Sequence, residues 1–105
     1  MVQMTPDEWG RLGEAIVVWS GWGRSPSPSR DETRLATHFG ERLAGELLPL
    51  IQELEEEFYS SDARYTAADL ADMAKVSAAQ FERKYPELSR EAVQALAWCY
   101  TFDYK

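Results

Sequence analysis

Apolar residues recur every three or four positions along most of this chain, a spacing that is typical of amphipathic helices. The first apolar stripe comprises Trp9, Leu12, Ala15, Ile16 and Trp19. It predicts a helix over 6–19 that begins with a capping box of Thr5 and Glu8, with Pro6 at the first helical position. Two glycines and two prolines follow within residues 20–29, and they predict a loop.

A second stripe runs through the middle of the chain and contains a proline. Its apolar positions are Leu35, Phe39, Leu43, Leu47, Ile51, Leu54 and Phe58. Pro49 lies inside this pattern, and proline removes a backbone donor and clashes with the carbonyl four residues earlier. We therefore expect a kink or break between Gly45 and Pro49 that separates a helix over 30–47 from one over 49–59.

The remainder of the chain predicts two more helices. Thr66 and Asp69 have the spacing of a capping box ahead of a helix over 67–84. Ser89 can cap a last helix over 89–102. The tail over 98–104 is ambiguous, because its aromatic side chains also alternate with the period of a strand. Helix is favoured there, since the chain offers no second strand for pairing.

These elements predict an all-α fold, a bundle of four to five helices in a single domain over residues 1–105. The length of 105 residues suits one domain, and the hydrophobic share of 45% provides enough apolar material for a core. The expected core comprises Trp9, Leu12, Ile16, Leu35, Phe39, Leu43, Leu47, Ile51, Leu54, Phe58, Leu70, Met73, Phe81, Val93 and Leu96.

The composition also limits where the protein is expected to act. No apolar run approaches the ~18 residues that a membrane span requires. The first residues lack the basic and apolar regions of a secretory signal. The single cysteine, Cys99, excludes an internal disulfide and is typical of a reducing compartment. We therefore expect a cytoplasmic protein with no membrane span.

The residues of common catalytic and metal sites are scarce. His38 is the only histidine and Cys99 has no cysteine partner, which excludes the usual zinc and dithiol motifs. A nucleophilic pair of Cys99 and His38 is conceivable, but a thiol in an apolar helix is usually buried and inert. We expect no cofactor, no bound metal and no enzymatic activity.

Negative charge is concentrated in the middle of the chain. Residues 31–59 hold eight acidic side chains against two basic ones, which accounts for most of the net charge of −7. A field of this sign attracts basic proteins and makes nucleic acid an unlikely partner. The candidate partner-binding residues are Glu53, Glu56, Glu57 and Asp62 for electrostatic steering, and Tyr59, Trp98 and Phe102 for contact.

The exposure of the aromatic candidates is open at this point. Trp98 and Phe102 lie one helical turn apart, on a different face from the apolar stripe of the last helix. Exposed aromatic side chains mark interaction surfaces, and Trp22 in the loop is a further candidate anchor. In the alternative interpretation, Trp98 packs against Trp9 and Trp19 and exposes little.

Small size, acidity, a helical core and aromatic side chains together resemble the immunity proteins of bacterial toxin systems. Thr37, His38 and Phe39 add a local similarity to the second helix of nuclease-colicin immunity proteins. The resemblance implies a cytoplasmic inhibitor that neutralises a basic partner, such as a toxin, by occluding its surface. The tyrosine pair of that family is absent, so no binding residue is carried over, and the oligomeric state is open.

Residues 66–86 support an alternative function. Their apolar and capping positions resemble the DNA-binding segment of TetR-type repressors, which is a helix-turn-helix. Lys75 stands where that family has its turn glycine, and Glu82 replaces an aromatic residue that faces phosphate. The resemblance implies a turn at Lys75 and binding to duplex DNA. One unbroken helix fits the same apolar spacing.

Overall fold

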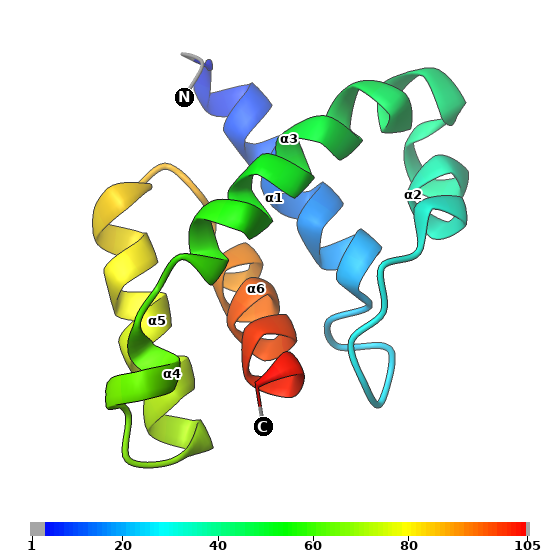
Figure 1. The fold of residues 1–105 in the computed structure, drawn as a ribbon. Coiled ribbons are helices and arrows are strands. Elements are labelled where there is room, and N and C mark those ends of the chain that lie inside the picture. The colour runs from blue at the N-terminus through cyan, green and yellow to red at the C-terminus, as the bar shows by residue number, and fades with distance from the viewer. Residues whose placement is uncertain (1–3, 105) are drawn as a thin grey trace.

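Helix α6 (Arg90–Asp103) lies at the centre of a helical bundle, as seen in the computed structural model, which describes residues 4–104. Around it pack α1 (Pro6–Ser20), α3 (Glu41–Tyr59) and α5 (Leu70–Lys84), while α2 (Glu32–Phe39) covers α1 and α3 (Figure 1). The turn α4 (Ala63–Thr66) joins α3 to α5. No strand occurs within residues 4–104, so the predicted all-α class is confirmed.

The central position of α6 follows from its sequence. Ser89 caps the helix, and its Oγ accepts a hydrogen bond from the amide of Ala92. The buried residues of α6 are Ala92, Val93, Ala95, Leu96, Ala97, Cys99 and Tyr100. Small side chains on several faces let neighbouring helices approach closely. The helix continues to Asp103, so the helical prediction for the aromatic tail is confirmed over 98–103.

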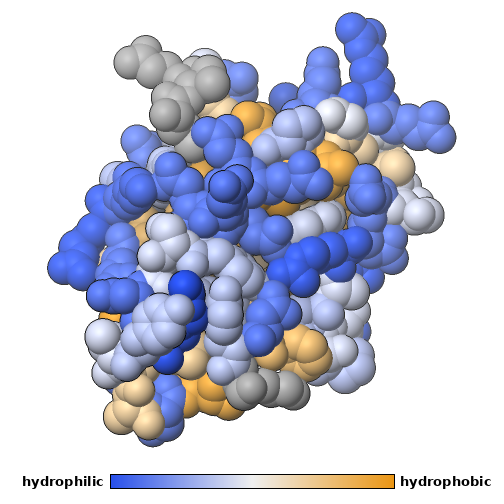
Figure 2. Space-filling model, viewed as in Figure 1, coloured by the Kyte–Doolittle hydropathy of each residue, from blue (hydrophilic) through white to orange (hydrophobic). Residues whose placement is uncertain are grey.

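Most of the residues expected in the core are buried, and the polar ones cover the outside. Figure 2 shows hydrophilic residues over most of the face that Figure 1 presents. Leu70 was expected in the core, but its side chain is 44% exposed because it begins α5 at the edge of the bundle. Phe39 and Leu43 are only partly buried, on either side of Gly40. No helix within residues 4–104 is long and apolar enough to cross a membrane.

Of the kink or break predicted between Gly45 and Pro49, the break is wrong. The chain breaks instead at Gly40, which adopts φ 86° and ψ 153°, and α3 continues through Pro49. Glycine adopts a positive φ at little cost because it has no Cβ. Gly45 and Pro49 both lie on the exposed side of α3. Pro49 has no N–H to donate to the carbonyl of Gly45. Because that carbonyl is accessible to solvent, water can satisfy it, and α3 tolerates the proline.

The helix predicted over 67–84 forms as α5, and the alternative of a helix-turn-helix over residues 66–86 does not. Thr66 ends α4 instead of capping the next helix, and Asp69 caps α5 by accepting from the amide of Asp72. From there α5 runs unbroken through Lys75. A left-handed turn at that position would be costly for a residue with a side chain, and the buried stripe of α5 stays on one face without it.

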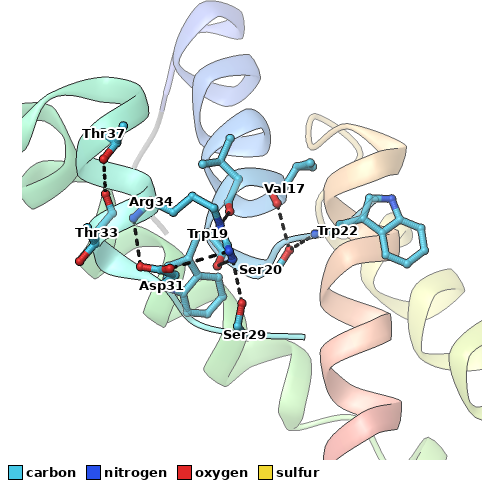
Figure 3. Close-up of polar contacts among 10 residues, drawn as sticks. Val17, Trp19, Ser20, Trp22, Ser29, Asp31, Thr33, Arg34 and Thr37 are labelled. Atoms are coloured by element: carbon cyan, nitrogen blue, oxygen red, sulfur yellow. Dashed lines mark hydrogen bonds and ion pairs between the residues drawn. The ribbon is translucent and has the colours of Figure 1, made fainter. Parts of the chain in front are cut away.

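The loop predicted over 20–29 is present, and Arg34 holds its two ends together (Figure 3). The guanidinium donates through Nε to the carbonyl of Val18 at 2.6 Å and through Nη2 to that of Trp19 at 2.9 Å. Nη2 also donates to Oγ of Ser29 at 2.8 Å. The last carbonyls of a helix have no hydrogen-bond donor within the helix. Arg34, which lies in α2, donates to two of these carbonyls at the end of α1. Gly21 ends α1 in the left-handed conformation, with φ 82°.

Candidate protein-binding surfaces

The outer side of α3 forms an acidic surface. Glu46, Glu53 and Glu56 are exposed there, opposite the buried stripe that includes Ile51 and Leu54. Within the described residues 4–104, none of these three carboxylates has an ion-pair partner. Two of the predicted steering residues, Glu53 and Glu56, thus lie together on a rigid helix. We call these three glutamates the acidic α3 surface.

Glu57 faces a different direction, although the sequence grouped it with its neighbours. Its carboxylate pairs with Nζ of Lys84, which binds α3 to the end of α5. The hydrogen bond from Lys84 lowers the pKa of Glu57, and burial together with a hydrogen bond to Glu57 raises the pKa of Tyr85 to about 12. Glu57 therefore belongs to the contact between α3 and α5.

Tyr59 is joined to a hydrogen-bonded cluster centred on Arg30. The guanidinium of Arg30 lies 2.6 Å from Oε2 of Glu55, 2.9 Å from Oη of Tyr59 and 2.8 Å from Oδ2 of Asp103. The Tyr59 hydroxyl itself donates to Asp103 at 2.5 Å. Burial and this hydrogen bond raise the pKa of Tyr59 above its ordinary value. The cluster joins the loop, α3 and α6, so Tyr59 is a structural residue as well as a candidate contact.

A stack of exposed side chains lies beside Tyr59, at the C-terminal ends of α3 and α6. The guanidinium of Arg64 is 4.6 Å from the ring centroid of Tyr65 and 4.7 Å from that of Tyr104. The side chains of Tyr65 and Tyr104 are 78% and 41% exposed. The ring of Tyr104 also lies 5.8 Å from that of Tyr59. We call Arg64, Tyr65 and Tyr104 the tyrosine–arginine stack.

Sequence analysis did not identify this stack. Tyrosine and arginine, like tryptophan, are enriched among the residues that contribute most of the binding energy in protein interfaces. The adjacency of Arg64 and Tyr65 is visible in the sequence, but Tyr104 joins them only because α4 folds against the end of α6.

Asp62, a predicted steering residue, is exposed next to α4, with its Oδ1 3.4 Å from Nε2 of Gln80. Phe102 is 40% exposed near the end of α6.

A groove between α5 and α6 forms a second surface. Its volume is about 580 Å³, and one wall is Trp98 packed edge-on against Trp22, with ring centroids 5.3 Å apart. Trp98 is therefore half-buried, and its partner is Trp22 instead of the expected Trp9 and Trp19. The groove residues are Trp22, Ala71, Ala74, Lys75, Ala78, Ala79, Glu82, Arg90, Gln94, Ala97, Trp98 and Thr101.

The groove and the acidic α3 surface lie on opposite sides of the α5–α6 layer. Phe81 of α5 and Tyr100 of α6 contact Phe58 of α3, with ring centroids 4.9 and 5.6 Å apart. Trp98 is two residues from Tyr100, which is about 200° around the helix, so the two side chains lie on opposite sides of α6. Trp98 lines the groove. The structure therefore does not bring Trp98 together with Glu53 and Glu56.

The residues considered for catalysis are apart from each other. Nε2 of His38 lies 2.8 Å from Oε1 of Glu14, which links α2 to α1 at the surface. Cys99 is buried in α6, and burial raises the pKa of its thiol to about 11, as expected for an inert core cysteine. Within residues 4–104, no group of three or more His, Cys, Asp and Glu side chains could hold a metal ion.

The acidic α3 surface and the tyrosine–arginine stack combine free charge with exposed rings, while the groove is open and has a floor of alanines. Comparisons with protein-family models, with curated proteins and with solved structures find no match to this chain.

Proposed function

We propose that this chain is an acidic protein-binding module that inhibits a basic partner protein by occluding its surface. The observation that carries the proposal is that Glu56, at one end of the acidic α3 surface, lies one helical turn before Tyr59, whose ring contacts that of Tyr104 in the tyrosine–arginine stack. Tyr59 therefore connects the acidic α3 surface to the stack. The C-terminal end of α3 thus offers charges for steering beside rings for contact.

The two parts of this area contribute to binding in different ways. Exposed carboxylates act over a Debye length of about 8–10 Å, so Glu53 and Glu56 raise the rate of encounter with a basic partner. Tyr65 and Tyr104 are large side chains with few rotatable bonds, so burying them costs little conformational entropy. They slow dissociation once the complex has formed. The guanidinium of Arg64 contacts both rings and so restricts their orientation.

The most specific form of the proposal is an immunity protein that neutralises a basic toxin in the cytoplasm. Support comes from the helical bundle, from the net charge of −7 and from the single buried cysteine, which is typical of a reducing compartment. Inhibition by occlusion needs no catalytic group on the inhibitor. The protein acts by covering the partner's basic surface.

Affinity capture from native lysate tests the proposal. Wild-type protein is immobilised next to two variants that carry the same change in charge, Glu53→Lys/Glu56→Lys and Glu87→Lys/Glu91→Lys. Glu87 and Glu91 are exposed near the start of α6 and lie outside both surfaces. We expect a basic protein to bind the wild type and the Glu87/Glu91 variant, and to be lost from the Glu53/Glu56 variant.

Kinetics of the captured protein then separate the two contributions. The Glu53/Glu56 variant should lower the association rate constant by at least about tenfold at low salt, with a smaller effect at high salt. Tyr65→Ala should mainly raise the dissociation rate, with a loss of about 2 kcal/mol in binding free energy. Equal retention of the same proteins by wild type, by the Glu53/Glu56 variant and by Tyr65→Ala would refute the proposal.

A further inference from the structure

The α5–α6 groove has a charge pattern that is complementary to itself. Lys75, Glu82 and Arg90 line it with exposed side chains, and within residues 4–104 none of the three forms an ion pair. Lys75 and Glu82 are about two helical turns apart on the same face of α5. The midpoint between them lies between Ala78 and Ala79. An antiparallel copy of α5 centred there places each lysine opposite a glutamate.

Helix α6 has a matching pattern on its groove side. Arg90 and Trp98 lie at equal distances along the chain from Gln94, and all three side chains line the groove. A guanidinium over an indole ring is a favourable cation–π pair. An antiparallel copy of α6 centred on Gln94 therefore brings each Arg90 to the Trp98 of the other copy.

The Ala78–Ala79 midpoint of α5 and Gln94 of α6 lie at the same level of the bundle. A single two-fold axis can therefore pass through both positions. Helices α5 and α6 run antiparallel as neighbours (Figure 1). At 1.5 Å per residue, the Ala78–Ala79 midpoint is about 8 Å before the end of α5 at Lys84. Gln94 is about 6 Å after the start of α6 at Arg90. A two-fold axis perpendicular to both helices therefore relates both sets of pairs.

We propose that two copies of this chain associate through the α5–α6 groove about this two-fold axis. The interface is isologous, and its four helices form an antiparallel layer against an identical layer. It contains two Lys75–Glu82 ion pairs and two Arg90–Trp98 cation–π pairs. Ala78 and Ala79 of the two copies meet at the axis, so the two α5 helices can approach closely there.

The position of the groove also favours a second copy as its occupant. Each chain has a net charge of −7, which opposes self-association. The groove itself has two basic residues and one acidic residue, and the acidic α3 surface lies on the far side of the α5–α6 layer. The two acidic surfaces of the dimer therefore point away from each other. This inference does not depend on the proposed function of the acidic α3 surface.

Sedimentation equilibrium of charge-swap variants tests the interface. We expect the wild type to reach a mass of about 24 kDa, twice the 12.0 kDa of one chain. Lys75→Glu and Glu82→Lys each place like charges across the axis, so each should weaken the dimer by at least about tenfold. Mixing the two variants restores both ion pairs in a heterodimer, so the mixture should return to dimer. The double variant Lys75→Glu/Glu82→Lys should dimerise on its own.

Matched variants control for net charge and for folding. Arg83→Glu and Glu87→Lys make the same changes in charge at exposed positions outside the groove, and both should dimerise like the wild type. Helical circular dichroism checks that every variant is folded. A wild type that stays monomeric at sub-millimolar concentration would overturn the proposal. So would single variants that dimerise normally, or a mixture of them that stays monomeric.

Discussion

Arg30 and Asp103 lie 73 positions apart in the sequence, and their side chains meet at 2.8 Å. Arg30 precedes α2 and Asp103 ends α6, so this ion pair joins the loop to the centre of the bundle. Burial opposes the charge on Arg30, but the hydrogen bonds that Arg30 donates to Asp103 and Glu55 outweigh it and raise the pKa of the guanidinium.

Removal of this guanidinium should destabilise the fold. Arg30→Met leaves Glu55, Tyr59 and Asp103 without their shared donor, and Glu55 and Asp103 then repel each other. We expect the free energy of unfolding in urea to fall by about 1–2 kcal/mol, a modest loss because Arg30 is partly exposed to solvent. Arg24→Met is the control, because Arg24 is exposed in the same loop; it should change stability by less than about 0.5 kcal/mol.

Arg34 should control the order of the loop more than the stability of the whole bundle. Arg34→Met removes its side-chain donors to the carbonyls of Val18 and Trp19. The loop is then held to the end of α1 by the backbone hydrogen bonds from Ser29 to Ser20 and from Asp31 to Trp19. Amide hydrogen exchange should accelerate across residues 19–31, with global stability lowered by no more than about 1 kcal/mol. Arg42→Met, at an exposed position of α3, is the matched control. Unchanged exchange in the loop would show that Arg34 does not hold it.

Pro49 should be a site where substitution stabilises the protein. It lies inside α3 on the exposed side, where alanine restores a helical hydrogen bond to Gly45 without losing buried contacts. Pro49→Ala should raise the free energy of unfolding by about 1–3 kcal/mol. Gln52→Ala, also exposed on α3, should change it by less than about 0.5 kcal/mol. A destabilised Pro49→Ala variant would mean that α3 needs the proline to keep its path.

The ion pair of Glu57 and Lys84 should make stability depend on pH in the acid range. The pKa of Glu57 in the folded protein is lower than its ordinary value of 4.5, so the unfolded chain takes up the proton first. The pair therefore stabilises the fold above about pH 4.5, and this contribution is lost as the pH falls through the lowered pKa. Denaturation measured between pH 7 and the acid range should show a smaller decline for Glu57→Gln than for wild type. Glu56→Gln, which removes an exposed carboxylate, serves as the control.

The sequence predicted the helices well because their apolar spacing and most of their caps are local features. Thr5 with Glu8, and Ser89, cap the helices where the pattern placed them. The chain breaks at Gly40 and not at Pro49 because the positive φ of Gly40 depends on how α2 turns onto α3. The direction of the turn is a tertiary property, so spacing alone does not reveal it.

The candidate site was predicted less completely, because charge in the sequence does not show which charges are free. Glu53 and Glu56 are exposed as expected, whereas Glu57 is paired with a lysine that lies 27 residues further along the chain. The ring of Tyr104 reaches Arg64 only through the packing of α4 on α6. Contacts between distant segments set the composition of both surfaces, and no local pattern encodes them.

Site-specific photo-crosslinking tests the central claim, that the acidic α3 surface and the tyrosine–arginine stack bind a basic protein. Benzoylphenylalanine is introduced in place of Tyr65, and separately in place of Glu87 as a control outside both surfaces, and each protein is irradiated in native lysate. We expect one basic protein to crosslink at position 65 and not at position 87, and the crosslink to disappear when Glu53 and Glu56 are changed to lysine. No crosslink at position 65, or a product that persists in the lysine variant and forms equally at position 87, would contradict it.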